Sequence, residues 1–119
     1  MTRPCFLVIE REYPGNISAR KLVIETEKMN VITAYSAAEG VETLRRFPTV
    51  DGIVLSAEVS DMPCATAAKA LKSVQPNVPL IVISPNGHEG CDLADHRLSS
   101  HDPQELLEVL SGLVARAAA

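Results

Sequence analysis

The chain has 119 residues, 46% of them hydrophobic and 22% charged, which predicts a single domain with one core. Its 11 basic and 15 acidic residues give a formal net charge of -4, which argues against a nucleic-acid-binding protein with a dominant basic face. The apolar runs are far shorter than the roughly 20 residues that cross a bilayer, so we expect no membrane-spanning segment.

Four short segments are apolar on both sides of the backbone, which is typical of parallel strands buried on both faces. We predict strands over residues 5–9, 31–34, 53–55 and 80–83. A weaker fifth strand is predicted around Arg97 and Leu98.

Segments with a helical period lie between these strands. The first helix follows residues 14–16, and we expect its inward face to contain Ala19, Leu22, Val23 and Thr26. A second helix begins with a capping box from Ser36 to Glu39 and ends near Phe47.

Two more helices complete the pattern. The third follows residues 61–63, and its expected apolar face is made of Ala67, Ala68, Leu71 and Val74. The last has Asp102 as its predicted N-cap and Pro103 at its first position, with a stripe of Leu106, Leu110, Leu113 and Val114. We expect residues 115–119 to form a frayed tail.

Strands that alternate with helices at these spacings predict an α/β fold, a doubly wound parallel sheet with helices on both faces. We expect residues 1–119 to form this one domain. Ligands of such folds bind at the carboxyl ends of the strands, so the residues that follow each strand are the candidate site.

The three cysteines, Cys5, Cys64 and Cys91, are odd in number and form no C-x-x-C pair. We expect them to be reduced, buried thiols in a cytoplasmic protein rather than parts of a disulfide framework.

The order of these segments resembles the receiver domain of bacterial response regulators, and the resemblance covers essentially the whole chain. Residues 6–14 match an apolar strand followed by acidic residues and a proline, and residues 50–56 and 78–84 match the third and fourth strands. The resemblance implies a five-stranded flavodoxin-like sheet with strand order 2-1-3-4-5.

The residues that carry receiver chemistry are changed. The resemblance places Ser56 where active receivers have the aspartate that accepts a phosphoryl group, and Arg11 where they have the second of two Mg²⁺-binding acids, while Glu10 keeps the first. Ser100, or Ser99 after a slip of one position, replaces a lysine that contacts the phosphoryl group.

The switch residues are altered as well. Ser84 matches the hydroxyl residue that senses the phosphoryl group, but Arg97 takes the place of the responding aromatic. Only 13 residues separate Ser84 from Leu98, so we predict that the fourth helix of the family is shortened or missing.

These substitutions predict a degenerate phosphoacceptor pocket that consists of Glu10, Arg11, Ser56, Glu58, Ser84 and Ser100. A structural serine at a strand end and a solvated acidic rim are the simpler interpretations of these residues, and no serine lies in the G-x-S-x-G motif of hydrolases. A metal site formed by His88, Cys91, His96 and His101 stays an alternative, although the spacing matches no standard zinc motif.

We therefore expect a stand-alone pseudo-receiver with no catalytic residue, cofactor or metal, which binds proteins of two-component signalling independently of phosphorylation. A histidine kinase or another regulator is the expected partner, and Arg20, Lys21 and Arg97 are candidate partner-binding residues. A monomer and a homodimer both stay open. The alternatives are a receiver-like domain switched by a small ligand, a metal ion or phosphorylation at another residue, and one domain of a longer protein.

Overall fold

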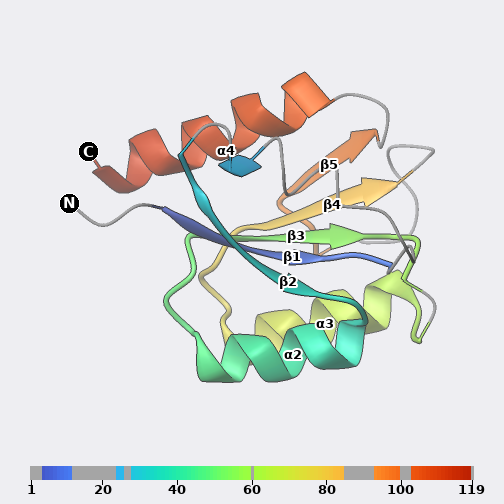
Figure 1. Cartoon of the computed structure of the whole chain (residues 1–119). Helices are drawn as coiled ribbons and strands as arrows, with labels where there is room; N and C mark the ends of the chain where they lie inside the picture. The colour runs from blue at the N-terminus through green and yellow to red at the C-terminus, as the bar shows by residue number, and fades with distance from the viewer. Residues whose placement is uncertain are drawn as a thin grey trace.

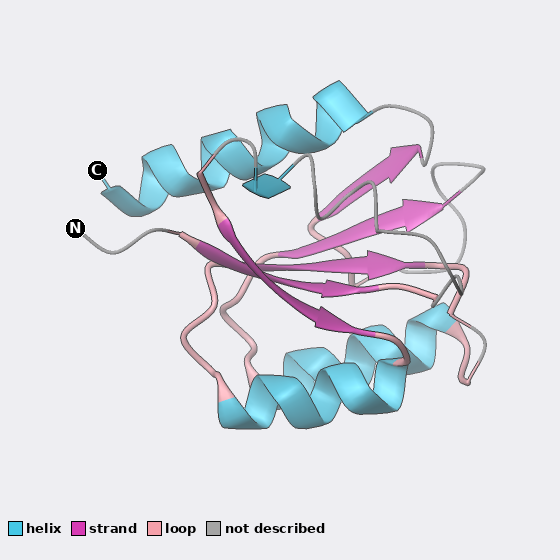
Figure 2. Ribbon diagram, in the orientation of Figure 1, coloured by secondary structure: helices cyan, strands magenta, loops and turns pink. Residues whose placement is uncertain are grey.

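The computed structural model describes residues 4–11, 24–25, 28–59, 61–84, 93–99 and 103–118. Five parallel strands form one sheet with the order β2-β1-β3-β4-β5, and all arrowheads point toward the same edge (Figures 1 and 2). The strands are β1 (Cys5–Ile9), β2 (Asn30–Ala34), β3 (Gly52–Ser56), β4 (Leu80–Ser84) and β5 (His96–Ser99). This architecture and strand order confirm the predicted fold.

Helices cover both faces of the sheet. Helices α2 (Ala37–Arg46) and α3 (Cys64–Val74) lie side by side on one face, and α4 (Pro103–Ala118) lies on the other (Figure 1). Because β1, β3 and β4 are interior strands, their side chains are buried on both sides, which explains their continuous apolar sequences.

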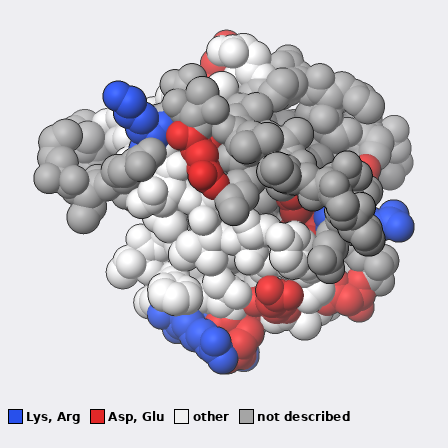
Figure 3. All heavy atoms as spheres, viewed as in Figure 1, with Lys and Arg blue, Asp and Glu red and all other residues white. Residues whose placement is uncertain are grey.

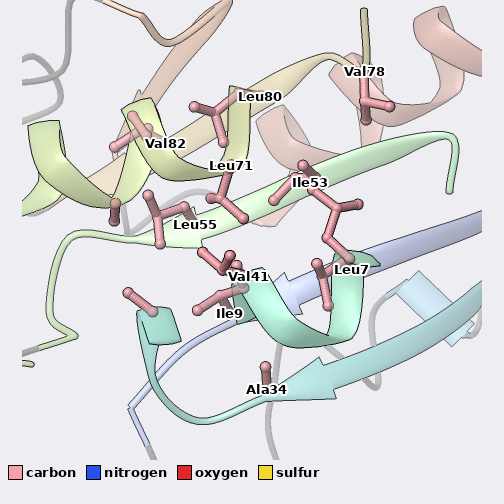
Figure 4. Close-up of a cluster of buried hydrophobic side chains, with 14 of the residues drawn as sticks. Leu7, Ile9, Ala34, Val41, Ile53, Leu55, Leu71, Val78, Leu80 and Val82 are labelled. Atoms are coloured by element: carbon pink, nitrogen blue, oxygen red, sulfur yellow. The ribbon is translucent and has the colours of Figure 1, made fainter. Parts of the chain in front are cut away.

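Alternate residues of each strand belong to two separate apolar clusters. Leu7, Ile53 and Val82 pack on the face of α2 and α3 (Figure 4), whereas Val8, Val54 and Ile81 pack on the face of α4. The predicted apolar faces of α3 and α4 are confirmed for their central residues: Ala67, Ala68, Leu71, Leu106 and Leu110 are all buried.

The first helix predicted from the sequence lies largely outside the described residues. Ile24 and Glu25 are helical, and Ile24 is fully buried although the predicted inward face omitted it. Lys28 follows with a φ of 63°, and the N–H groups of Lys28 and Met29 donate to the carbonyls of Glu25 and Ile24. This pattern is a Schellman motif, which ends the helix and turns the chain into β2.

A hydrogen-bond network holds the start of β5, the short outermost strand of the sheet. The network lies at the amino ends of the strands, opposite the candidate site. Asp95 accepts hydrogen bonds from Lys72 Nζ and from the backbone N–H of Leu80, each at 2.7 Å. Lys72 Nζ also donates to the carbonyl of Val78 at 3.0 Å. Partial burial acts to raise the pKa of Asp95, but these two hydrogen bonds and the charges of Lys72 and His96 together hold it below its usual value.

Two further predictions concern the end of α4 and the connection between β4 and β5. Helix α4 continues to Ala118 and so includes residues 115–118, for which we expected a frayed tail; alanine has the highest helix propensity, which favours this continuation. The predicted shortened or missing fourth helix falls on the β4–β5 connection, of which residues 85–92 lie outside the described residues. Within the described part of the chain, no helix has the length and hydropathy to cross a bilayer.

Two helical glycines allow a matched test of the packing between α2 and the sheet. A Cβ on Gly40 would overlap Cδ1 of Ile9 and lie 2.7 Å from its Cγ1, whereas a Cβ on Gly112 in α4 would meet nothing within 4 Å. We expect Gly40→Ala to lower the free energy of unfolding by about 1 to 3 kcal/mol, because Ile9 is fully buried and cannot move away.

Gly112→Ala serves as the control and should raise the free energy of unfolding by about 0.5 to 1 kcal/mol, the gain in helix propensity alone. Urea unfolding of the two variants measures both values. Equal stabilisation by the two substitutions would contradict the close approach of α2 to β1.

Candidate functional site

The candidate site lies where the carboxyl ends of β1, β3 and β4 meet. Ile9 is the partner of Leu55 in the β1–β3 register, and Ser56 is the partner of Ile83 in the β3–β4 register. The residues that end or directly follow these strands are therefore neighbours along the edge. They include Glu10, Ser56 and Ser84, which the sequence predicted to form one pocket.

These three residues are the buried polar or charged residues of the described part of the chain. Glu10 is 5% exposed, Ser56 1% and Ser84 5%. Arg11 and Glu58, also predicted to belong to the pocket, have exposed side chains. The carboxyl edge thus has a buried polar interior with charged residues at its rim.

Ser56 has a structural role that its neighbours define. Its Oγ accepts a hydrogen bond from the backbone N–H of Glu58 at 3.2 Å, and its carbonyl accepts one from the N–H of Val59 at 3.3 Å. This is the local turn chemistry typical of serine at the end of a strand. The hydroxyl of Ser56 therefore stabilises the turn that leads from β3 toward α3.

The two buried serines project to different faces of the sheet. Side chains alternate along a strand, so Ser56 lies on the side of β3 that carries Val54, toward α4. By the same rule Ser84 lies on the side of β4 that carries Val82, toward α3. The fold brings their backbones together but directs their hydroxyls apart.

Asp61 also lies at this end of the sheet, although it was not among the site residues predicted from the sequence. Its two carboxylate oxygens accept hydrogen bonds from the backbone N–H groups of Ala37 and Ala38, each at 2.9 Å. Ser36 Oγ accepts the N–H of Glu39 at 3.0 Å, which confirms its predicted capping role. The carboxylate therefore joins the β3–α3 connection to the amino end of α2.

This contact has an electrostatic consequence for Asp61. The hydrogen bonds from Ala37 and then Ala38 hold the pKa of Asp61 below its usual value, with slight desolvation opposing them. A negative charge at the start of a helix is also favoured by the helix dipole. Because its partners are more than 20 residues away in the chain, no local sequence signal could reveal this role.

The remaining predicted residues are not all placed at the edge. Arg97 is exposed in β5, where its backbone partner is Val82 in the middle of β4. Ser100, Arg20 and Lys21 lie outside the described residues.

The alternative metal site also falls mainly outside the described residues. His88, Cys91 and His101 are not described, and His96 is the first residue of β5. Among the described residues, no group of three or more His, Cys, Asp or Glu side chains is arranged to hold a metal ion.

The expectation that all cysteines are reduced is wrong for Cys64, which is disulfide-bonded. Cys5, at the amino end of β1, is a free thiol, and burial followed by the nearby charge of Asp51 raises its pKa. The sequence rule failed because widely spaced cysteines can still be brought together by the fold, whatever their spacing.

Comparison with solved structures gives the same architecture over nearly the whole chain. A response regulator receiver domain protein from Clostridium thermocellum superimposes with a TM-score of 0.80 and 20% identity, covering 97% of both chains. The chain has the receiver-domain fold. A sensor protein from Polaromonas sp. JS666 gives a TM-score of 0.82 with 22% identity over 97% of this chain and 98% of that one.

A third similar structure is the receiver domain of a sensor histidine kinase from Pseudomonas aeruginosa PAO1 with a magnesium ion coordinated in its active site cleft. It has a TM-score of 0.79 and 16% identity, and the match covers 96% of this chain and 99% of that one. These low identities describe a shared receiver fold, not a shared site.

Sequence comparison finds similarity to two transcriptional regulatory proteins. The chain is 28% identical over 85 residues, 71% of its length, to the transcriptional regulatory proteins GlrR of Escherichia coli K12 and QseF of Escherichia coli O157:H7. The matched stretch is 19% of the length of each of those proteins. No family model matches the chain.

The role of Asp61 at the start of α2 can be tested by pH. Because the folded-state pKa is lowered, the contribution of Asp61 to stability is complete above the unfolded value of about 4 and is lost as pH falls through the folded-state pKa. We expect Asp61→Ala to cost about 1 to 2 kcal/mol at neutral pH, as the loss of a helix cap does.

Asp61→Asn, which keeps an acceptor oxygen without the charge, is the matched variant for the pH series. Below about pH 4 the wild-type free energy of unfolding, measured with urea, should fall more steeply than that of Asp61→Asn, so the two curves converge. A difference between the two proteins that stays constant across this range would contradict the charged cap.

Proposed function

We propose that this chain is a pseudo-receiver: a protein-interaction module of bacterial signal transduction that acts without phosphorylation. The observation that carries the proposal is Ser56. It occupies the carboxyl end of β3, is almost fully buried, and uses its hydroxyl oxygen to hold the following turn.

The chemistry of phosphoryl transfer supports this proposal. An active receiver forms an acyl phosphate, which requires a carboxylate at the end of β3. A serine hydroxyl needs a neighbouring general base to become a nucleophile. The Ser56 oxygen already accepts the N–H of Glu58, an arrangement that serves a turn rather than catalysis.

The residues after β1 are poorly suited to Mg²⁺. This ion needs near-octahedral oxygen ligands and carboxylate charge to displace its hydration water. Glu10 supplies one carboxylate, but Arg11 follows it directly, and a guanidinium at this rim opposes a second positive charge. The chain thus keeps one of the two acids that the resemblance to receivers leads us to expect there.

A module without phosphoryl chemistry would act by docking in one conformation. Its partners would be signalling proteins, a histidine kinase or another regulator, in the cytoplasm. Arg97 on the exposed edge strand β5, together with Arg20 and Lys21, is the proposed contact set, and such charges mainly accelerate association.

On the face shown in Figure 3, the described basic and acidic side chains are mixed rather than gathered into one basic patch. Basic side chains gather over the carboxyl end of α2, next to acidic ones (Figure 3), and Arg45 pairs with Glu42 at 3.3 Å. The module would need neither enzymatic activity nor a cofactor.

Incubation with acetyl phosphate and Mg²⁺, followed by intact mass measurement, tests the proposal. We expect no phosphoryl adduct on the wild-type protein and none above background on Ser56→Asp, because Arg11 still occupies the metal-binding rim. The double variant Ser56→Asp with Arg11→Asp should show more labelling than Ser56→Asp alone.

Circular dichroism should show that the variants remain folded before their labelling is compared. A stable adduct on wild-type Ser56 would overturn the proposal. Rapid Mg²⁺-dependent labelling of the single variant Ser56→Asp would overturn the part of the argument that depends on Arg11.

A further inference from the structure

Strand β2 is one of the two outermost strands of the sheet, so one side of its backbone has no neighbouring strand. On its other side β2 pairs with β1 in parallel. The N–H of Asn30 donates to the carbonyl of Pro4 at 2.7 Å, and the N–H of Glu10 donates to the carbonyl of Ala34 at 3.0 Å. The first and last residues of β2 therefore direct their backbone groups toward β1.

The alternation of the strand places the remaining backbone groups on the open side. In a parallel strand the N–H and C=O of one residue point to the same side, and those of the next residue point to the opposite side. Since Asn30 and Ala34 face β1, Val31 and Thr33 direct their N–H and C=O groups away from it. Among the described residues, no strand pairs with these groups. Strand β2 thus offers donors and acceptors at the spacing that another extended strand requires.

The side chains of β2 show that this edge is accessible. Ile32 is the register partner of Leu7 and packs in the same apolar cluster, yet Leu7 is fully buried and Ile32 only half-buried. Thr33 and its register partner Val8 differ in the same way. Strand β2 is the strand nearest the viewer in Figure 1, and the described surface over its middle is uncharged in Figure 3. An incoming strand would therefore meet an open, uncharged edge.

The two outermost strands differ in how they are protected. Outer strands usually carry features that prevent pairing with another chain, such as a charged side chain, a proline or a bulge. Strand β5 carries the exposed Arg97, whereas β2 contains no charged residue, proline or glycine. The central residues of β2, Val31, Ile32 and Thr33, are all β-branched, a type that favours extended structure. Strand β2 is therefore the outer strand better suited to pair with another one.

We propose that this chain forms a homodimer in which β2 of one copy pairs with β2 of a second copy, antiparallel, about a two-fold axis at Ile32. Val31 of each copy then lies opposite Thr33 of the other, and each such pair exchanges two N–H···O hydrogen bonds. A second copy fits this edge because the outward residues are spaced equally on either side of Ile32, and because no like charges face each other.

The position of α2 is compatible with this pairing. Helix α2 contacts both β1 and β2, so in the joined sheet the two copies of α2 would lie about two strand spacings, or ~10 Å, apart. Packed helices are separated by roughly 8 to 10 Å. Each α2 has Glu39 in its first turn and Arg45 and Arg46 in its last. An antiparallel arrangement places the acidic end of one helix near the basic end of the other, which further favours a second copy as the partner.

The dimer would present two signalling surfaces. Because the paired strands run in opposite directions, the carboxyl ends of the two five-stranded sheets lie at opposite ends of the joined sheet. One dimer could therefore hold two partner proteins at once, or bind a dimeric partner with increased avidity. The pairing uses no residue of the candidate site and does not depend on the proposed function.

Sedimentation equilibrium over about 10 µM to about 1 mM protein tests the dimer directly. The small interface predicts weak, reversible association. The average mass should rise with concentration from 12.8 kDa toward twice this value. A mass that stays at 12.8 kDa at about 1 mM would overturn the proposal, and so would a dimer that persists in denaturant without reductant, since such a dimer is covalent.

Amide hydrogen exchange of the wild-type protein tests which edge is used. When half of the chains are dimeric, exchange of the Val31 and Thr33 amides should be about twofold slower than in dilute protein, because only the monomer exposes them. The amides of Ile32 and Ala34 lie on the β1 side and should exchange slowly at every concentration. A dimer that forms without slowing exchange at Val31 and Thr33 would show that another surface is used and would contradict the proposal.

Two substitutions at one position separate the backbone contact from the side chain. Thr33→Pro removes an outward N–H without removing a bond to β1, and should raise the Kd of the dimer at least about tenfold. Thr33→Val keeps this N–H and the β-branched shape, and replaces a buried hydroxyl that has no hydrogen-bond partner, so the Kd should stay within about twofold of wild type.

Circular dichroism should show that both variants are folded before their association is compared. An unchanged Kd in folded Thr33→Pro, or an equal loss of association in both variants, would overturn the pairing through β2. The exchange measurement uses wild-type protein alone, so it decides the proposal even where Thr33→Pro fails to fold. Neither measurement involves phosphoryl labelling, and the failure of one proposal would leave the other standing.

Discussion

Burial of β1, β3 and β4 on both faces is the constraint on which the rest of this structure depends. Each interior strand sends alternate apolar side chains into two clusters, one beneath α2 and α3 and one beneath α4. A shift of the register by one residue would exchange these faces, so the apolar pattern fixes the alignment of the strands. That alignment in turn places Glu10, Ser56 and Ser84 along one edge.

The polar residues at the carboxyl ends of the strands are distinct from the apolar residues that stabilise the fold. Large buried side chains such as Phe6, Leu55 and Ile81 lie within the strands, whereas the polar residues lie at or beyond the strand ends. The side chain at the end of β3 contributes little to this apolar core, so the architecture does not depend on which polar residue stands there. The edge instead retains a structural use: Ser56 holds a turn, and Asp61 ties the next connection to α2.

Features governed by local pattern could be predicted from the sequence, and features governed by long-range contacts could not. The strands follow from continuous apolar runs, and the cap at Ser36 follows from residues within one helical turn. Asp61 and Asp95 act on partners 15 to 24 residues away, and Cys64 is disulfide-bonded outside any recognisable spacing. Position at the edge could be predicted for Ser56 and Ser84, but the opposite directions of their side chains depend on where each strand ends.

The proposed function requires that the carboxyl ends of β1 and β3 do not bind Mg²⁺. The most direct measurement is a titration of ¹⁵N-labelled protein with Mg²⁺, followed through the amide signals of Glu10, Arg11, Ser56 and Ala57. We expect no saturable change in these signals at millimolar Mg²⁺. Saturable shifts confined to these four amides, with a Kd near or below about 1 mM, would contradict it.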